Sequence, residues 1–151
     1  MTLLPEPPSG CFEGPVHRYA VRVYFEDTDL SGLVYHANYL RWFERARSDM
    51  LRLLGIDQRA AVEAGEGAYA VADLAIRYVV PARLDDVVRV ESVAEELRAA
   101  SCRIRQQAYR DDTLLSEAKV RVGFIDPAGR PRRQPAAWRQ AFASISLVPE
   151  G

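Results

Sequence analysis

The sequence predicts an α+β fold in which a long helix precedes an antiparallel sheet. Three observations indicate it: a strand-like run that ends in an acidic turn, an amphipathic segment of about five helical turns, and four later strand-like runs joined by short turns. At 151 residues the chain can bury roughly two-thirds or more of the surface that its unfolded form exposes. One domain with a sizeable core is therefore expected.

We expect this domain over residues 15–147, after an N-terminal arm at residues 1–14. The arm is rich in proline, contains two glycines and lacks hydrophobic periodicity, which predicts a flexible segment. It lacks the basic start and apolar run of a signal peptide, and no segment approaches the roughly 18 consecutive apolar residues of a membrane span. Two cysteines, Cys11 and Cys102, fit a reducing compartment. A cytoplasmic protein without membrane insertion is expected.

The first strand is predicted just before an acidic cluster. Apolar residues alternate there with mostly polar ones, which is the two-residue period of a strand. The alternating positions are Tyr19, Val21, Val23 and Phe25 against Arg18, Ala20, Arg22 and Tyr24. The acidic residues Glu26, Asp27 and Asp29 therefore end a strand rather than a helix.

A single long helix is predicted to begin near Tyr35 or His36 and to run to Gly55. Apolar residues recur there at steps of three and four, as on the buried side of a helix, while polar residues occupy the other side. The apolar positions are Tyr39, Leu40, Phe43, Ala46, Met50, Leu51 and Leu54, and the polar ones are Arg41, Glu44, Arg45, Ser48 and Arg52. Gly55 is a suitable stop because glycine is common just after a helix.

Four strand-like runs follow the helix. They begin with the alternating Leu74, Ile76, Tyr78 and Val80 and continue as Val87–Val93, Ser101–Tyr109 and Leu114–Ile125. A proline and two short polar turns separate or end them, and such links favour antiparallel pairing. After a proline-bounded stretch, Trp138, Phe142 and Ile145 fall at helical spacing and predict a short packing helix.

The segment DTDLSGLVYHANYLRWFERAR, from Asp27 to Arg47, resembles the signature of hotdog-fold acyl-CoA thioesterases of the 4-hydroxybenzoyl-CoA thioesterase type, in particular their Tol–Pal-associated (YbgC-like) branch. The resemblance extends through YVVPARLDDVVRV to the last strand, roughly residues 18–125. It implies a hotdog fold, in which a curved antiparallel sheet wraps around the long helix, and the hydrolysis of acyl-CoA thioesters. It also implies that Asp29, the second aspartate of the D-x-D-x-x-G motif, is catalytic.

The residues of this motif suit that chemistry. Thioester hydrolysis needs a nucleophile or a base-activated water at the carbonyl carbon, and hydrogen-bond donors for the carbonyl oxygen. The Asp29 carboxylate meets the first need as nucleophile or general base, and both roles stay open. Unpaired N–H groups at the helix start meet the second, and the resemblance assigns the His36 amide as the donor. The helix dipole is expected to keep Asp29 ionised.

Neighbouring residues are expected to assist, although each also has a purely structural explanation. The His36 imidazole could aid Asp29 or only pack at the helix start. Tyr35 and Asn38 match the family pattern, and each could line the acyl pocket or pack and cap locally. Asp27 is expected to order the turn through backbone hydrogen bonds, and Asp29 itself could be a simple cap.

The CoA phosphates are expected to meet basic side chains, and Arg98 is the candidate. The benzoyl-CoA branch carries a basic pair before its fourth strand; Arg98 matches its first member, but Ala100 stands at the second, so the nucleotide contacts depart from the family pattern. Arg103 and Arg105 could substitute, or could form only the solvated face of a strand. The candidate catalytic residues are thus Asp29, His36 and Tyr35, and the candidate substrate-binding residues are Asn38 and Arg98.

No metal or cofactor is expected. Asp27, Asp29, Ser31 and Gly32 match the first positions of a calcium-binding EF-hand loop, but its twelfth position is Asn38 instead of glutamate, and a strand precedes it instead of a helix. The two histidines and two distant cysteines give no ligand spacing.

The predicted function is hydrolysis of an acyl-CoA, or of an acyl carrier protein thioester, with the acyl group left open. By resemblance the site lies between protomers, so a homodimer or homotetramer is expected, and residues 68–74 either start a wall of the acyl pocket or form a plain buried strand. A net charge of −1 gives no case for nucleic acid. Two alternatives stay open: a non-catalytic acyl-CoA-binding hotdog subunit, and an enoyl-CoA hydratase, whose family spaces its aspartate and histidine differently.

Overall fold

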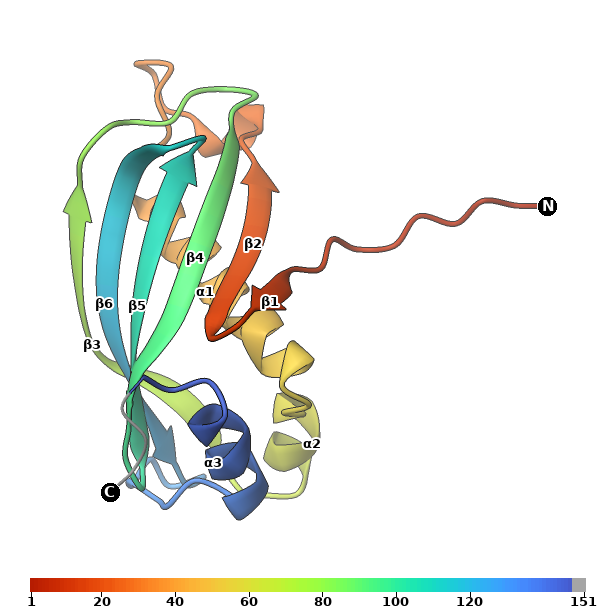
Figure 1. The fold of residues 1–151 in the computed structure, drawn as a ribbon, viewed down its shortest axis with the longest axis vertical. Helices are drawn as coiled ribbons and strands as arrows, with labels where there is room; N and C mark the ends of the chain where they lie inside the picture. Colours follow the sequence, from red (N-terminus) through yellow and green to blue (C-terminus); the bar gives the residue numbers. More distant parts are fainter. Residues whose placement is uncertain (148–151) are drawn as a thin grey trace.

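A computed structural model describes residues 1–147 as a sheet packed against a long helix, with two short helices at one end (Figure 1). The elements in chain order are β1 (Cys11–Glu13), β2 (Val16–Arg22), the 3-10 turn η1 (Phe25–Asp27), α1 (Ala37–Leu53), α2 (Gln58–Glu63), β3 (Ala68–Tyr78), β4 (Val87–Leu97), β5 (Ser101–Arg110), β6 (Thr113–Ile125) and α3 (Ala136–Ala143). This is the predicted α+β arrangement. Within residues 1–147, no helix is long and apolar enough to cross a membrane.

The strands of the described chain form one antiparallel sheet in the order β1-β2-β4-β5-β6-β3. The segment containing α1 and α2 connects β2 to β3, which lie toward opposite edges, so α1 crosses one face of the sheet (Figure 1). Register shifts interrupt the pairing within β3, β4 and β6, and such bulges bend strands. The sheet therefore curves around α1, while β3 keeps one edge unpaired.

α1 buries one side against the sheet because its apolar residues recur at helical spacing. Phe43, Ala46 and Met50 have no exposed surface. The first two belong to a buried cluster near the helix start, and Met50 belongs to a second cluster that includes α2 and α3. The predicted stop is confirmed, since Gly55 has a φ of +78° just beyond the helix. Leu40, predicted to be buried, is 38% exposed.

The first predicted strand is too long at its C-terminal end. β2 stops at Arg22, and Phe25 lies in η1 with 82% of its surface exposed. The Asp27 carboxylate accepts a hydrogen bond of 2.9 Å from the Tyr24 amide and so closes a turn. This local capping contact overrides the alternating pattern that continues to Phe25.

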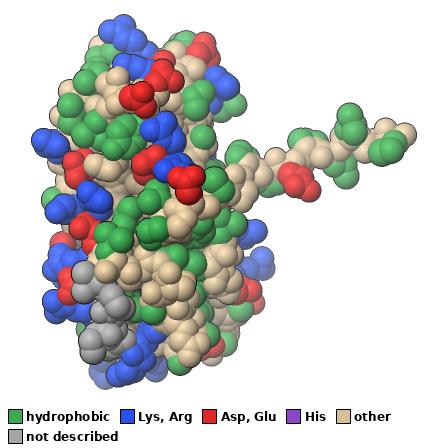
Figure 2. Space-filling view, in the orientation of Figure 1, with side chains coloured by type: hydrophobic (Ala, Val, Ile, Leu, Met, Phe, Trp, Pro, Cys, Tyr) green, Lys and Arg blue, Asp and Glu red, His purple; other side chains and the backbone are tan. Residues whose placement is uncertain are grey.

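The N-terminal arm is shorter than predicted. Cys11–Glu13 forms β1 and pairs with β2, so the sheet begins before residue 15. Residues 1–8 extend away from the body (Figure 1) and carry the exposed apolar side chains Met1, Leu3 and Leu4. On the face seen in Figure 2, apolar side chains follow this extension, while basic and acidic side chains are interspersed over the body.

The later elements agree with the prediction except near β3. α3 is confirmed, with Trp138 and Phe142 buried. β3 begins at Ala68, earlier than the alternation at Leu74 indicates, and most of its residues are partly or fully exposed, so this segment is not a plain buried strand. The short helix α2 is not predicted; the Asp57 side chain caps it by accepting a hydrogen bond of 2.9 Å from the Ala60 amide.

A buried polar junction ties the N-terminal segment to β2 and α1. The His17 ring is fully buried, and its Nε2 lies 2.7 Å from Oδ2 of Asp49 on α1. The Gly10 amide donates to the same oxygen at 3.0 Å. A Cβ on Gly10 would lie 2.3 Å from the Arg18 carbonyl and 2.7 Å from the Asp49 carboxylate, so only glycine fits without a shift.

We expect Gly10→Ala to lower the free energy of unfolding by about 1–3 kcal/mol, because the added methyl group overpacks this junction. Gly123→Ala is the matched control, since its Cβ would meet only the Ala100 carbonyl at an ordinary 3.9 Å. The control is expected to change stability by less than about 1 kcal/mol. Urea denaturation of the three proteins measures both effects, and equal stabilities for the two variants would contradict the role of the junction.

Candidate active site

The loop between η1 and α1 is closed by hydrogen bonds to Asp27. The Tyr35 amide and the Asn38 side-chain amide both donate to the Asp27 carbonyl, at 2.9 and 2.8 Å. The Asp27 carboxylate is occupied by the Tyr24 amide. Asp27 therefore orders the loop, as predicted, and the Asn38 side chain is used in building the loop.

A second set of bonds ties this loop to the connection between β3 and β4. The Val34 amide donates to the Ala82 carbonyl at 2.9 Å, and the Ala82 amide donates to the hydroxyl of the buried Tyr39 at 3.0 Å. Tyr39 lies on the first turns of α1. The loop, the helix start and the β3–β4 connection are thus held together as one unit.

Asp29 lies in this loop with its side chain exposed. Its Oδ1 accepts hydrogen bonds from the Ser31 hydroxyl and, at 2.8 Å, from the Ser31 amide. These two bonds stabilise the charged form and hold the pKa of Asp29 below its usual value. The Asp29 carboxylate is therefore ionised at neutral pH, and its oxygen Oδ2 is free of hydrogen bonds within the described chain.

The start of α1 offers two backbone donors beside this loop. His36 is the N-cap residue and α1 begins at Ala37, as predicted. The Asn38 and Tyr39 amides donate to the Tyr35 and His36 carbonyls, at 2.9 and 3.4 Å. Within residues 1–147 the His36 and Ala37 amides have no acceptor, so both can bind an oxygen atom at the positive end of the helix dipole.

The His36 imidazole packs among aromatic rings. Its ring centre lies 4.7 Å from that of Tyr35 and 5.9 Å from that of Tyr78. The Tyr78 hydroxyl donates to the His36 carbonyl at 2.9 Å and so fixes the helix start from β3. Within the described residues, no hydrogen bond or ion pair joins His36 to Asp29. The structure thus brings His36 and Tyr35 to the helix start but does not pair either side chain with the carboxylate.

Exposed apolar side chains surround Asp29. It lies in an open hollow together with Phe25, Leu30 and Leu84. The relative accessible surface areas of these three residues are 82%, 109% and 46%. Apolar side chains gathered around a charged group are usually covered by a ligand or by another protein surface. The hollow is thus suited to contact with a substrate or a second chain.

Arg98, the predicted phosphate contact, lies far from this loop in the chain. It occupies the turn between β4 and β5, next to the end of the sheet where α3 packs (Figure 1). Its guanidinium is largely exposed and pairs with Glu96 at 2.6 Å. Within one chain, Arg98 and Asp29 therefore do not form a common site.

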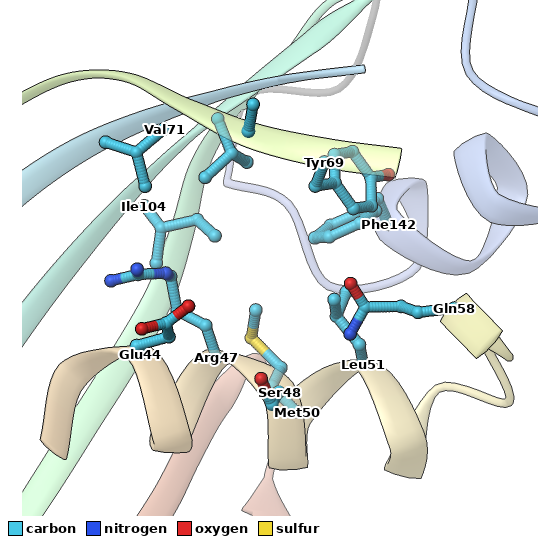
Figure 3. A pocket seen from close by; sticks show the side chains of 12 residues that line it. Glu44, Arg47, Ser48, Met50, Leu51, Gln58, Tyr69, Val71, Ile104 and Phe142 are labelled. Carbon is cyan, nitrogen blue, oxygen red and sulfur yellow. The ribbon is translucent and has the colours of Figure 1, made fainter. Parts of the chain in front are cut away.

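A separate cavity of about 270 Å³ lies between the second half of α1 and the sheet (Figure 3). Figure 3 shows α1 side chains on one side, side chains of β3 and α3 on the other, and Gln58 of α2 at one end. Its lining is mostly apolar, and the polar residues are Glu44, Arg47, Ser48 and Gln58. Val71 and Tyr69 come from the segment predicted as an acyl-pocket wall.

The cavity and Asp29 are separated along α1. No residue lines both the Asp29 hollow and the cavity. Glu44, the lining residue nearest the helix start, lies seven residues beyond Ala37, which is about 10 Å along a helix. One chain therefore holds the carboxylate and the apolar cavity in different places.

Two residues of the site were missed from the sequence as functional groups. Ser31, which holds Asp29, follows it by two residues, the spacing at which aspartate side chains commonly bond to the backbone. That spacing is a signal that the sequence does contain. Tyr78 reaches His36 from 42 residues away, and no local pattern indicates such a contact.

Comparisons with known proteins identify the family of this chain. The profile of the family described as the thioesterase-like superfamily matches residues 23–145. The acyl-CoA thioesterase YbgC of Haemophilus influenzae is 42% identical over 125 residues, which are 80% of this chain and 92% of that protein. The crystal structure of a probable thioesterase from Bartonella henselae is 35% identical, with a TM-score of 0.75, and the match covers 80% of this chain and 99% of that one.

A solved 4-hydroxybenzoyl-CoA thioesterase has a TM-score of 0.77 at 24% identity, with 84% of this chain and 98% of that chain covered. At this identity the likeness shows the fold alone. The predicted hotdog fold is thereby confirmed. Since the family profile spans most of the sequence and a relative 42% identical covers 80% of it, the chain belongs to the thioesterase-like superfamily.

Proposed function

We propose that this protein hydrolyses acyl-CoA thioesters to the free acid and CoA. The observation that carries the proposal is the exposed, ionised Asp29 in a loop that leads into a helix start with two unpaired amides. The relationship to acyl-CoA thioesterases at 42% identity supports it. A carboxylate and a pair of amides together supply what thioester hydrolysis needs.

The reaction adds water across the carbon–sulfur bond. Asp29 takes a proton from a water molecule, whose oxygen bonds to the carbonyl carbon, and the carbon–sulfur bond then breaks, so that the thiolate leaves and is protonated. Alternatively, Asp29 attacks the carbonyl carbon itself, and water hydrolyses the resulting anhydride. In both routes the carbonyl oxygen becomes negative and accepts hydrogen bonds from the His36 and Ala37 amides. The buried thiol Cys102 is not suited to attack, because burial raises its pKa to about 12.

We expect Asp29→Asn to lower kcat/KM for acyl-CoA hydrolysis by at least about 10²-fold, since the amide is neither a base nor a nucleophile. The measurement is thiol release from a panel of short, long and aromatic acyl-CoAs. Glu26→Gln is the matched control, because it removes another exposed carboxylate from the adjacent turn η1, and it should leave the rate unchanged.

The same panel separates the alternatives. Unchanged hydrolysis by folded Asp29→Asn would remove Asp29 from the mechanism. A folded wild-type protein that binds acyl-CoAs without releasing thiol would be the non-catalytic binding subunit. Hydration of an enoyl-CoA without thiol release would identify the hydratase.

The Ser31 hydroxyl should set the acid limb of the pH profile. The folded protein holds the pKa of Asp29 below its usual value, so activity is retained on acidification until the pH falls through that lowered pKa. Ser31→Ala removes the hydroxyl donor, raises the pKa of Asp29 and shifts the acid limb of kcat/KM to higher pH. Thr28→Ala is the control, because the Thr28 hydroxyl donates to the Phe25 carbonyl instead. An acid limb that stays in place in Ser31→Ala would exclude this role.

We also propose that the working enzyme is a homodimer or a homotetramer. One chain keeps Asp29 and the apolar cavity apart, so a second copy is needed to bring a cavity to the carboxylate. β3 supports this, since it is an eleven-residue edge strand with an unpaired side, and such edges readily pair with another chain. The exposed apolar side chains around Asp29 offer further surface for contact.

Mixing two inactive variants tests this arrangement. Asp29→Asn lacks the carboxylate, and Ser48→Trp is designed to fill the cavity. If each site combines Asp29 of one protomer with the cavity of another, refolding the two variants together should restore about a quarter of the wild-type activity, because half of the dimers then contain one intact site of two. No recovery from mixed dimers, shown to form by their mass, would place both parts in one chain.

We also propose that the protein is cytoplasmic. Both cysteines are free, which fits a reducing cytoplasm.

Arg98 remains our candidate for the CoA phosphates only if an assembly brings its turn near the Asp29 of another protomer, since within one chain the two are apart. Asn38 is better assigned to supporting the loop, because its side-chain amide is bonded to Asp27.

A further inference from the structure

We propose that the cavity beneath α1 binds the distal end of an acyl group that ends in a carboxylate, and that Arg47 selects this group. This inference rests on the proposed function, since it names the substrate class of that reaction. The cavity has mostly apolar walls, and Arg47 is the cationic side chain among the residues that line it. Its chemistry therefore matches a short apolar chain with a negative end.

Arg47 is a buried cation without a buried anion. Only 9% of its surface is exposed, and in residues 1–147 no carboxylate forms an ion pair with it. Burial lowers the pKa of Arg47, which reflects the cost of removing its charge from water. Buried charges are normally paired, so an oxyanion beside this guanidinium would supply the missing partner.

A neutral network holds Arg47 in place but uses one of its nitrogens. Its Nη1 donates to Oε1 of Gln106 at 2.9 Å. Gln106 is fully buried and is itself fixed, because its Nε2 donates to the Phe43 carbonyl at 2.9 Å and to the Ser92 hydroxyl at 3.0 Å. The amide orientation is thus set by other groups, and the Arg47 guanidinium is held in one position.

The remaining donors of Arg47 are available to a ligand. Its Nε and Nη2 make no hydrogen bond in the described chain, yet neither is among the fully buried atoms that lack a partner. Both nitrogens therefore keep some accessible surface, and Arg47 is one of the residues that line the cavity. A guanidinium presents its N–H groups as a planar fork that fits the two oxygens of a carboxylate.

The Glu44 carboxylate acts on the charge of Arg47 without occupying its guanidinium. Its exposed side chain lies at the same end of the cavity as Arg47 in Figure 3, and its charge raises the pKa of Arg47. Among the ion pairs of residues 1–147, none joins Glu44 to Arg47, so Glu44 leaves the guanidinium available to a ligand. A negative side chain near the site should nevertheless weaken the binding of a carboxylate.

The size of the cavity limits the acyl group. Its volume of about 270 Å³ lies just below the range of about 300–1,000 Å³ for drug-sized ligands. Short acyl groups with a terminal carboxylate fit this limit. The glutaryl group and the 5-methylhexanoyl group form a matched pair, because the second replaces the carboxylate by an uncharged isopropyl group of the same shape.

Binding is tested first, independently of turnover. The probes are two CoA thioethers that carry these chains with CH₂ in place of the thioester carbonyl, so neither can be hydrolysed. We expect wild-type protein to bind the carboxylate probe at least about 10-fold more tightly in calorimetry. Arg47→Met should abolish the preference, Arg47→Lys should keep part of it, and Glu44→Gln should increase it. Arg45→Met is the matched control, since Arg45 is an exposed arginine of the same helix that does not line the cavity.

Equal binding of the two probes, preference for the isopropyl probe, binding of neither, or a preference that survives in folded Arg47→Met would each overturn the inference. Should Arg47→Met fail to fold, the wild-type preference together with the responses of Arg47→Lys and Glu44→Gln decides. Hydrolysis of glutaryl-CoA and 5-methylhexanoyl-CoA is then compared. Hydrolysis of both at equal kcat/KM would leave the proposed function and remove the selectivity, while selective binding of the probes with no hydrolysis of either would remove the function and leave the site.

Discussion

The packing of α1 against the concave face of the sheet is the interaction on which the rest of the structure depends. Phe43 and Met50 are fully buried in it, and each such side chain contributes roughly 1.5–3 kcal/mol. The same packing positions both parts of the proposed site. It holds the helix start, with its unpaired amides, beside the Asp29 loop, and it holds Arg47 over the cavity farther along the helix.

Several hydrogen bonds hold the site loop in its conformation. Asp27 accepts hydrogen bonds from three donors, and Ser31 donates to the Asp29 carboxylate. The bond between Val34 and Ala82 ties the loop to the β3–β4 connection. The lowering of the pKa of Asp29 comes first from the Ser31 hydroxyl and then from the Ser31 amide. The helix dipole, from which the ionised form was expected, is not among the causes of this lowering. An ordered carboxylate next to ordered donors is the arrangement that electrostatic catalysis requires.

Two buried polar positions, the His17–Asp49 pair and Arg47, differ in whether a charged partner is present. At the junction of β2 and α1, His17 faces Asp49 at 2.7 Å, and burial lowers the pKa of His17 despite the aspartate. This pair lies under the N-terminal segment and ties it to the helix. Arg47 has no such anionic partner in the described chain and borders open space instead. The contrast separates a polar group that is used in packing from one that is available to a ligand.

Local patterns determined most of the fold and the chemical core of the site. Helical spacing placed α1 and α3, alternation placed the later strands, and the D-x-D-x-x-G motif placed Asp29 ahead of the helix start, because these features depend on neighbours only a few residues apart. Tertiary structure alone decided the rest. The turn between β4 and β5 puts Arg98 at the end of the sheet where α3 packs, away from the Asp29 loop. Tyr78 reaches His36 and Gln106 holds Arg47 because the fold brings together residues that are distant in sequence. Such contacts join positions whose separation no local period encodes, so the cavity and its buried cation become visible only once the sheet has folded around the helix.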